Sequence, residues 1–311
     1  MLIALIVIAV LVVLSLLVIY GGFSLAFKPY RQKVDDYRKI PNDSQMREYK
    51  DKVFKLCDEF VSLPNEEVSI RSFDGYRLVG RYYEVKAGAP IIIQCHGYHG
   101  SSIRDFCASN RISREAGLNT LLIEERAMQR SEGRAITFGI NERWDVKSWC
   151  EYLTERFGSV PIFLMGVSMG AATVLMASDL DLPENVVGVI ADCPYSSPMK
   201  ILMKVGSEQQ VFHHFLKPIT RLSAKIFGRF DIEEATPIDA VQHTRLPIMV
   251  IHGLADDFVP YSMSKDLKEA NPDIRLELFP DAHHVMCSVI DMERYSRIFN
   301  EFISDALQDG R

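Results

Sequence analysis

The sequence predicts an α/β fold with a mostly parallel sheet of eight strands and helices on both faces. Two observations lead to this prediction. Short apolar runs recur after residue 67 and end in polar or glycine residues, which is typical of strands buried on both faces. Segments with helical periodicity separate these runs, and strands that alternate with helices form a parallel sheet. Residues 67–311 of the 311-residue chain suffice to bury a full core.

The first 27 residues contain no charged side chain, and residues 2–20 are almost entirely Leu, Ile, Val and Ala. About 20 apolar residues span the roughly 30 Å hydrocarbon core of a bilayer, so we predict a transmembrane anchor over residues 1–27. A cleaved signal peptide is the alternative, but it would carry a basic residue before a shorter apolar stretch. The first basic residue is Lys28, which favours an uncleaved anchor.

Basic residues directly after the anchor predict its orientation. They are Lys28, Arg31, Lys33, Arg38 and Lys39. Since positively charged flanks tend to stay in the cytoplasm, we expect a single-pass protein of the cell membrane with its catalytic body in the cytoplasm.

Composition excludes several other classes of protein. With a net charge of −6 and scattered Lys and Arg after residue 60, the chain lacks the basic face that nucleic-acid binding requires. The cysteines form no C-x-x-C pair and lie mostly in apolar stretches, as buried free thiols do. They are Cys57, Cys95, Cys107, Cys150, Cys193 and Cys287. Free thiols agree with a reducing compartment.

A helix is expected between the anchor and the body. Residues 42–44 (Asn, Asp, Ser) offer N-caps, and Pro64 closes the segment. The apolar residues between them fall on one helical stripe: Met46, Tyr49, Val53, Leu56 and Phe60. We therefore predict that residues 28–66 form a juxtamembrane helical connector that packs on the body, residues 67–311.

The body begins with a predicted hairpin, because residues 68–73 and 76–86 alternate around Asp74-Gly75. Six further strands are predicted at residues 90–95, 119–124, 160–166, 186–191, 246–252 and 274–279. Helices are expected at residues 143–157, 168–178, 262–270 and 291–307. Residues 195–240 show helical patterning without a strand, so we expect a helical lid insertion over the carboxyl ends of the strands.

The fifth predicted strand leads into Gly166-Val167-Ser168-Met169-Gly170, and a helix begins directly afterwards. Glycines flank the serine because so sharp a turn leaves no room for side chains beside it. The turn exposes the hydroxyl, and the helix N-terminus behind it favours developing negative charge. The bare pattern occurs by chance about 0.1 times in a chain of this length. It is the strand–turn–helix context that makes Ser168 the predicted nucleophile.

A serine hydroxyl needs a base, and the base needs an acid that orients it. Asp256 follows the seventh predicted strand at its carboxyl end and is the predicted acid. Asp257 and Asp192 are the alternatives. The last strand is followed by His283 and His284, and their positions alone leave both open as the base.

Backbone donors for an oxyanion are expected at two places. Met169, directly after the nucleophile, would supply one N–H group, and Tyr98, after the third predicted strand, would supply the other. His96 and His99 have a metal-like spacing, but no nearby carboxylate or cysteine completes a site. We therefore predict neither a metal nor an organic cofactor.

The stretch from about residue 67 to residue 307 resembles bacterial α/β-hydrolases described as serine aminopeptidase-like or related to dipeptidyl aminopeptidases and acylaminoacyl-peptidases. The matching motifs are His96-Gly97-Tyr98, Arg126 with Ser131-Glu132-Gly133, Gly166-Val167-Ser168-Met169-Gly170-Ala171-Ala172, Asp192-Cys193-Pro194-Tyr195, and His252-Gly253 with Asp256 and Val259-Pro260. The resemblance implies an α/β-hydrolase fold. In similar proteins the C-terminal histidine precedes a small or apolar residue and then Met or Leu. This pattern selects His284, so the implied triad is Ser168, Asp256 and His284.

One motif departs from the resemblance. Similar proteins usually read Arg-x-His-Gly-x-Ser where this chain has Arg126-Ala127-Met128-Gln129-Arg130-Ser131. Neither missing residue belongs to the triad, so the departure concerns the shape of that loop and the substrate.

These observations lead us to expect a serine hydrolase that cleaves a carboxylic ester through an acyl-enzyme. The alternatives are a serine peptidase or aminopeptidase and a catalytically inert, membrane-tethered binding scaffold. All three triad candidates are present, which favours an enzyme. An apolar insertion beside a membrane anchor indicates a small-molecule acyl substrate that is lipophilic, or else a peptide. Its apolar residues are Met199, Ile201, Leu202, Met203, Phe212, Phe215 and Leu216.

Overall fold

A sheet of eight strands forms the centre of the computed structural model, which describes residues 1–31, 36–40, 44–208 and 213–309. The strands are β1 (Glu66–Arg71), β2 (Arg77–Tyr83), β3 (Ile91–Cys95), β4 (Asn119–Ile123), β5 (Ile162–Val167), β6 (Val186–Asp192), β7 (Ile248–Gly253) and β8 (Arg275–Phe279). Their order across the sheet is β1-β2-β4-β3-β5-β6-β7-β8. Only β1 with β2 and β2 with β4 pair antiparallel. The predicted hairpin and mostly parallel sheet are confirmed.

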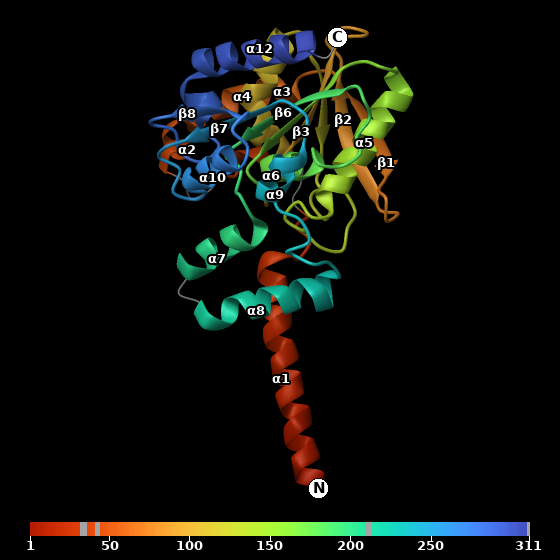
Figure 1. Ribbon diagram of the computed structural model, residues 1–311, viewed down its shortest axis with the longest axis vertical. Coiled ribbons are helices and arrows are strands. Elements are labelled where there is room, and N and C mark those ends of the chain that lie inside the picture. Colours follow the sequence, from red (N-terminus) through yellow and green to blue (C-terminus); the bar gives the residue numbers. More distant parts are fainter. Residues whose placement is uncertain (32–35, 41–43, 209–212, 310–311) are drawn as a thin grey trace.

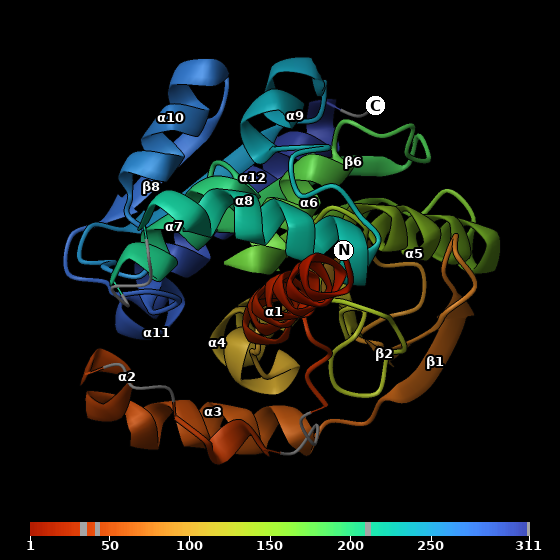
Figure 2. The same ribbon diagram turned by 90° about the horizontal axis from the view of Figure 1, so that it is seen from below.

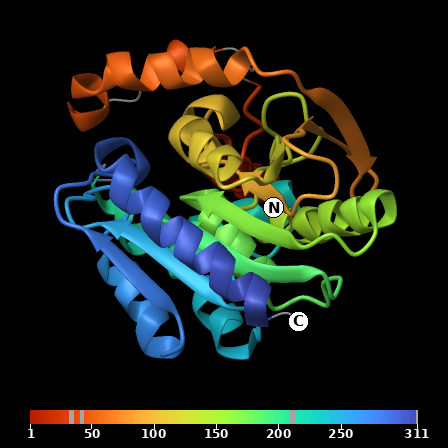
Figure 3. The same cartoon turned by 90° about the horizontal axis from the view of Figure 1, so that it is seen from above.

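Alternate side chains of the central strands enter two different cores, one on each face of the sheet. Ile92 of β3 packs in one core, and its neighbours Ile91 and Ile93 pack in the other. The first core includes α4 (Ser102–Glu115), α11 (Cys287–Ile290) and α12 (Met292–Asp309). The second includes α5 (Glu142–Phe157), α6 (Met169–Ala177), α9 (Pro237–His243) and α10 (Ser262–Ala270). Figure 3 shows these helices on the two faces of the sheet. All six cysteines are buried and free.

The connector helix forms as two pieces, α2 (Ser44–Glu48) and α3 (Lys50–Val61), after a short turn of 3-10 helix at Asp36–Arg38. The break lies at Tyr49, whose φ of −93° and ψ of 10° turn the backbone out of the helical path. The break directs α2 towards the loop after β8, where Gln45 Nε2 donates to the carbonyl oxygen of Asp281 at 2.7 Å. The predicted apolar stripe still packs on the body: Met46, Val53, Leu56 and Phe60 are buried and Tyr49 is half-buried.

The N-terminal helix α1 (Leu2–Ala26) is long and apolar enough to cross a membrane. Residues 1–18 are exposed and project away from the body (Figure 1). Its last turns pack on the body instead. Phe23, and Phe27 directly after the helix, are buried in a third core near the carboxyl ends of the strands. The same third core contains Met169 of α6 and Tyr195 after β6.

The predicted helical insertion between β6 and β7 is confirmed. It contains α7 (Pro198–Glu208), α8 (His213–Ser223), a π turn η2 (Ala224–Gly228) and α9, and none of its described residues forms a strand. Met199 and Ile201 of α7 pack into the third core. Phe212, expected in the apolar set, lies outside the described residues. α8 packs across α1 at the base of the body (Figures 1 and 2).

Candidate active site

Ser168 lies in the turn between β5 and α6, where its φ is +55°. This conformation is strained for a residue with a side chain, and such strain is typical of functional sites. The turn requires the flanking glycines. A Cβ at Gly166 would lie 2.1 Å from the carbonyl oxygen of Gly170, and a Cβ at Gly170 would lie 1.9 Å from that of Cys95. The sharp turn therefore exposes Ser168, and the glycines two positions before and after it let the backbone pack closely.

The structure brings Ser168, His284 and Asp256 together from three separate loops. Ser168 Oγ lies 2.9 Å from Nε2 of His284, and Nδ1 of the same ring lies 2.7 Å from Oδ2 of Asp256. With the proton on Nδ1, the ring donates to the carboxylate and leaves Nε2 free to accept the serine proton. The arrangement has the geometry of a nucleophile, a base and an orienting acid.

The carboxylate of Asp256 is buried but well solvated by the protein. Its Oδ1 accepts the backbone N–H groups of Phe258 at 3.0 Å and Val259 at 2.8 Å. A second histidine, His252, is also close, with its Nε2 3.3 Å from Oδ2 of Asp256. Burial alone would raise the pKa of Asp256, but His284 and His252 outweigh it and hold the pKa well below its usual range. Asp256 is therefore ionised at neutral pH.

The alternative residues occupy other environments. Asp257 is exposed at the rim of the cavity. Asp192 is buried, accepts a hydrogen bond from the hydroxyl of Tyr295 at 3.0 Å, and has a pKa raised by burial to about 6. The backbone N–H of His283 donates to Gln45 Oε1 at 2.8 Å. The ring of His284, the next residue, is the one that lies within hydrogen-bonding distance of Ser168.

Both residues predicted to donate to an oxyanion lie near the serine, Met169 next to it in the chain and Tyr98 in the lining of the same cavity. Met169 is the first residue of α6. Among the described residues, neither backbone N–H has an acceptor within the protein. The N–H of Gly97 donates instead to Asp105 Oδ2 at 3.1 Å, which fixes the turn and leaves the N–H of Tyr98 available.

A cavity of about 390 Å³ opens beside Ser168 and His284. Apolar side chains from separate segments line it: Met46, Tyr98, Phe258 and Val285. Arg104 and Asp105 form a charged pair at 3.3 Å in the same lining. None of the described residues of the insertion between β6 and β7 lines this cavity, although α7 lies close to it. Lys204 of α7 lies 5.8 Å from the ring centroid of Phe258.

Sequence reasoning missed the residues that support the loop around His284. Gln45 binds this loop twice, through Asp281 and His283, and nothing in its sequence surroundings marks it. His252 was part of a matching motif, but its place beside Asp256 was not predicted. Its Nδ1 accepts from Ser264 at 2.6 Å, and its Nε2 donates to the carbonyl oxygen of Val259 at 2.8 Å.

Two groups of residues have donor atoms of the kind that metals bind. Ligand atoms of Cys193, Asp256 and His284 lie within 4.8 Å of one another. The hydrogen bonds described above already use the latter two, and burial raises the pKa of the Cys193 thiol well above its usual value. His96 and His99 do not converge on a ligand. His96 accepts the backbone N–H of Glu125 at 3.1 Å, and His99 stacks between two tyrosine rings.

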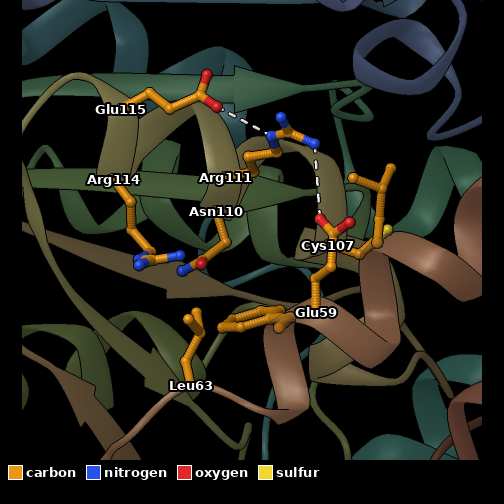
Figure 4. A pocket seen from close by; sticks show the side chains of 9 residues that line it. Glu59, Leu63, Cys107, Asn110, Arg111, Arg114 and Glu115 are labelled. Atoms are coloured by element: carbon orange, nitrogen blue, oxygen red, sulfur yellow. Dashed lines mark hydrogen bonds and ion pairs between the residues drawn. The ribbon is translucent and has the colours of Figure 1, made fainter.

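A second cavity, of about 310 Å³, lies between α3 and α4. Figure 4 shows Arg111 extending between Glu59 and Glu115 at its wall, with distances of 3.5 and 2.9 Å. Its cysteine, Cys107, is buried, and its thiol pKa is raised well above the usual value by the hydrogen bond that it donates to Cys57 and by burial. This cavity contains no nucleophile paired with a base.

Comparison with known proteins finds relatives of similar length. The chain is 23% identical to the uncharacterised protein YqkD of Bacillus subtilis over 255 residues, which cover 80% of this chain and 83% of YqkD. It is 25% identical to the uncharacterised protein YfhR of Escherichia coli over 228 residues, covering 71% and 73% of the two chains.

Solved structures with the same fold include an esterase and a protein with bound ferulic acid. An esterase of Pyrococcus furiosus superposes with a TM-score of 0.67 at 19% identity, covering 89% of this chain and 98% of that one. Est1E of Butyrivibrio proteoclasticus with bound ferulic acid gives a TM-score of 0.60 at 17% identity, covering 78% and 99%. These similarities show the α/β-hydrolase fold.

The family match extends over more than half of the chain and includes the three loops of the site. Residues 137–310 match the prolyl oligopeptidase family of peptidases, and they contain Ser168, Asp256 and His284. With its eight-stranded sheet and helical insertion, this α/β-hydrolase chain belongs to the prolyl oligopeptidase family.

Proposed function

We propose that the chain is a serine hydrolase that cleaves a carboxylic ester of a lipophilic acyl substrate. Ser168 Oγ attacks the carbonyl carbon while its proton moves to Nε2 of His284. Asp256 stabilises the resulting imidazolium through the hydrogen bond to Nδ1. The N–H groups of Met169 and Tyr98 donate to the oxyanion.

The tetrahedral intermediate then collapses. Nε2 of His284 gives its proton to the departing alkoxide, the ester C–O bond breaks and an acyl-enzyme remains on Ser168. Water attacks the acyl carbon and loses a proton to His284. The second collapse releases the carboxylic acid and returns the proton to Ser168 Oγ. These residues and water supply every proton transfer, so the scheme needs no cofactor.

The distance of 2.9 Å between Ser168 Oγ and His284 Nε2 carries this proposal. A serine hydroxyl is a weak nucleophile, and a base within hydrogen-bonding distance is the means of activating it. The ionised state of Asp256 supports the role of the base, because a buried carboxylate favours the imidazolium. The apolar residues that line the cavity support a lipophilic acyl group.

The test compares wild-type full-length protein with Ser168→Ala in detergent micelles, using p-nitrophenyl esters of two to sixteen carbons. We expect kcat/KM to fall by about 10⁴-fold or more in the variant, because the nucleophile is lost. Ser62→Ala is the matched control. Ser62 is exposed at the end of α3, where its hydroxyl donates to the carbonyl oxygen of Glu59. Hydrolysis that persists in Ser168→Ala would overturn the assignment.

Peptide hydrolysis is the second candidate, and the family match supports it. The fold similarity to the esterase of Pyrococcus furiosus supports ester hydrolysis. Aminoacyl p-nitroanilides distinguish the two, because a peptidase should cleave them faster than fatty acyl esters. A folded wild-type protein inactive on both series would instead favour the binding scaffold.

We also propose that α1 crosses the cell membrane once and that the body lies in the cytoplasm. The basic residues after α1, including Lys28 and Arg31, support this orientation. A C-terminal alkaline phosphatase fusion should therefore be inactive and a C-terminal green fluorescent protein fusion should fluoresce. The opposite pair of results would place the body outside the cytoplasm.

A further inference from the structure

Helix α8 and the π turn η2 expose an apolar stripe. Phe215, Leu222 and Ile226 are 63%, 43% and 45% exposed. They are spaced seven and four residues apart, so their side chains lie on one side of the helix. An exposed stripe of large apolar side chains marks an interaction surface.

A neighbouring side of α8 is fixed to the N-terminal helix. Ser223 Oγ donates to the carbonyl oxygen of Ile19 at 2.6 Å. A Cβ at Gly22 would lie 2.7 Å from the same Oγ, so glycine permits the close approach of the two helices. The ring of Phe227 packs edge-on against Tyr20 with centroids 5.2 Å apart. These contacts fix α8 at residues 19–23 of α1.

This crossing point coincides with the expected surface of a bilayer. Residues 1–18 of α1 are exposed, and 18 helical residues are about 27 Å long. The hydrocarbon core of a bilayer is about 30 Å thick. Beyond residue 19 the helix enters the protein, where Phe23 is buried. Figure 1 shows α8 lying across α1 at the start of the projecting part, and Figure 2 shows α8 beside α1 seen end-on.

The apolar stripe faces away from the body. Residues two positions apart on a helix point to roughly opposite sides, at about 100° per residue. Ala224 is buried in the third core and Thr220 is also buried. Leu222 and Ile226 therefore point away from the body, on the side from which residues 1–18 of α1 extend.

A basic stripe runs beside the apolar one. Lys217, Arg221 and Lys225 follow at intervals of four residues, and the first two are about half exposed (49% and 51%). Glu233 binds both of these, with Lys217 at 3.4 Å, and so offsets one of the three charges. Basic residues beside an apolar stripe are typical of helices that lie in a membrane surface, where they contact lipid phosphates.

We propose that α8 and η2 lie in the plane of the membrane surface, with Phe215, Leu222 and Ile226 inserted among the lipid acyl chains. The partner of this surface is thus the lipid bilayer that α1 crosses, and the inference rests on that crossing. Together α1 and α8 would hold the body at a fixed height and angle.

The test measures the depth of a spin label in full-length protein reconstituted in phosphatidylcholine–phosphatidylglycerol vesicles. All six native cysteines are buried, so a label on Leu222→Cys reports mainly that site. We expect this label to be more accessible to oxygen than to a water-soluble nickel complex. Val85→Cys is the matched control in the loop after β2, since Val85 is 42% exposed. Its label should show the reverse.

Two further labels keep the test independent of the other proposals. A label at Val10→Cys reports whether α1 itself has entered the bilayer. The depth of a label does not depend on catalysis, so the same labels in a Ser168→Ala background must give the same depths. Phe215→Cys serves if the Leu222 variant does not fold. The proposal is wrong if a label at Val10 lies in lipid while labels at Leu222 and Phe215 are as accessible to the nickel complex as the Val85 label.

Discussion

Two aspartates lie at the carboxyl ends of neighbouring strands of this sheet, and their surroundings give them different chemistry. Asp256 receives two backbone N–H groups and lies against two histidines, which lower its pKa. Asp192 is equally buried, has one hydroxyl as its partner and has a pKa raised to about 6. Its backbone is what serves the site, because the carbonyl oxygen of Asp192 accepts the N–H of Ser168 at 2.8 Å. Solvation by the protein, rather than position along the sheet, separates the two carboxylates.

Gln45 contacts the backbone on the N-terminal side of His284. Its amide accepts the N–H of His283 and donates to the carbonyl oxygen of Asp281. In Gln45→Ala both of these bonds between α2 and the loop are lost. A hydrogen bond contributes about 1 kcal/mol, so we expect kcat to fall about 5- to 30-fold with KM less affected. Steady-state kinetics on the best p-nitrophenyl ester measure this.

Two further variants separate this role from a general loss of stability. Gln45→Glu keeps the acceptor for the N–H of His283 and should recover part of kcat. Gln242→Ala removes a glutamine that bonds only within α9, to the carbonyl oxygen of Ile238. It should leave kcat unchanged. If Gln45→Ala loses no more activity than Gln242→Ala, the loop is positioned by other contacts.

Some residues of this site could be predicted from the sequence and others could not. Ser168 was recognisable because the turn that it occupies requires glycines on both sides. The choice of His284 over His283 depended on resemblance, since adjacent histidines carry no geometric signal of their own. Gln45 and Met46 could not be predicted, because they reach the site across more than 230 residues of sequence. Such contacts depend on tertiary packing, which no local pattern encodes.

The strands were the easiest elements to predict, and α4 and α11 are helices that the sequence analysis did not single out. Fully apolar runs such as β3 and β5 are buried on both faces, so their composition alone marks them. The longer of these two, α4, is rich in polar residues, and most of them are buried, including Asn110 and Ser113. Asn110 bonds to Thr120 at 3.3 Å, and Ser113 bonds back to the carbonyl oxygen of Ser109 at 2.8 Å. Polar groups satisfied inside the core conceal the amphipathic pattern of a helix.

The boundary between anchor and body also differs from the simplest interpretation of the sequence. Residues 1–27 contain no charged side chain, so the sequence places the boundary at Lys28. In the structure the change comes earlier. Phe23 and Phe27 pack with Phe138 and Phe230 in the third core, with the rings of Phe27 and Phe230 5.3 Å apart. A membrane-facing and a protein-facing phenylalanine have the same hydropathy, which is why the sequence does not separate them.

For the molecule as a whole, α1 is connected to the candidate active site. The hydroxyl of Tyr98 donates to the carbonyl oxygen of Ala26 at 3.0 Å, at the end of the helix. The same residue lines the cavity and is the proposed second donor to the oxyanion. The ring of Tyr98 also stacks on Phe138, with centroids 4.9 Å apart, in contact with the third core. The last turn of α1 is therefore part of the support for the loop that would bind the oxyanion.

This connection predicts that the hydrolase body cannot be separated from α1 at residue 28. A fragment that starts at Lys28 loses Phe23 and Phe27, and removing a buried phenylalanine side chain costs about 3–5 kcal/mol. We expect its melting temperature to lie about 10 °C or more below that of a fragment starting at Val18, which keeps both rings and Ile19. Circular dichroism melts in the same mild detergent compare the two. The shorter fragment also lacks the acceptor for Tyr98, so its kcat should fall even below its melting range. Equal melting temperatures and equal kcat would show that the last turns of α1 belong to the membrane and not to the enzyme.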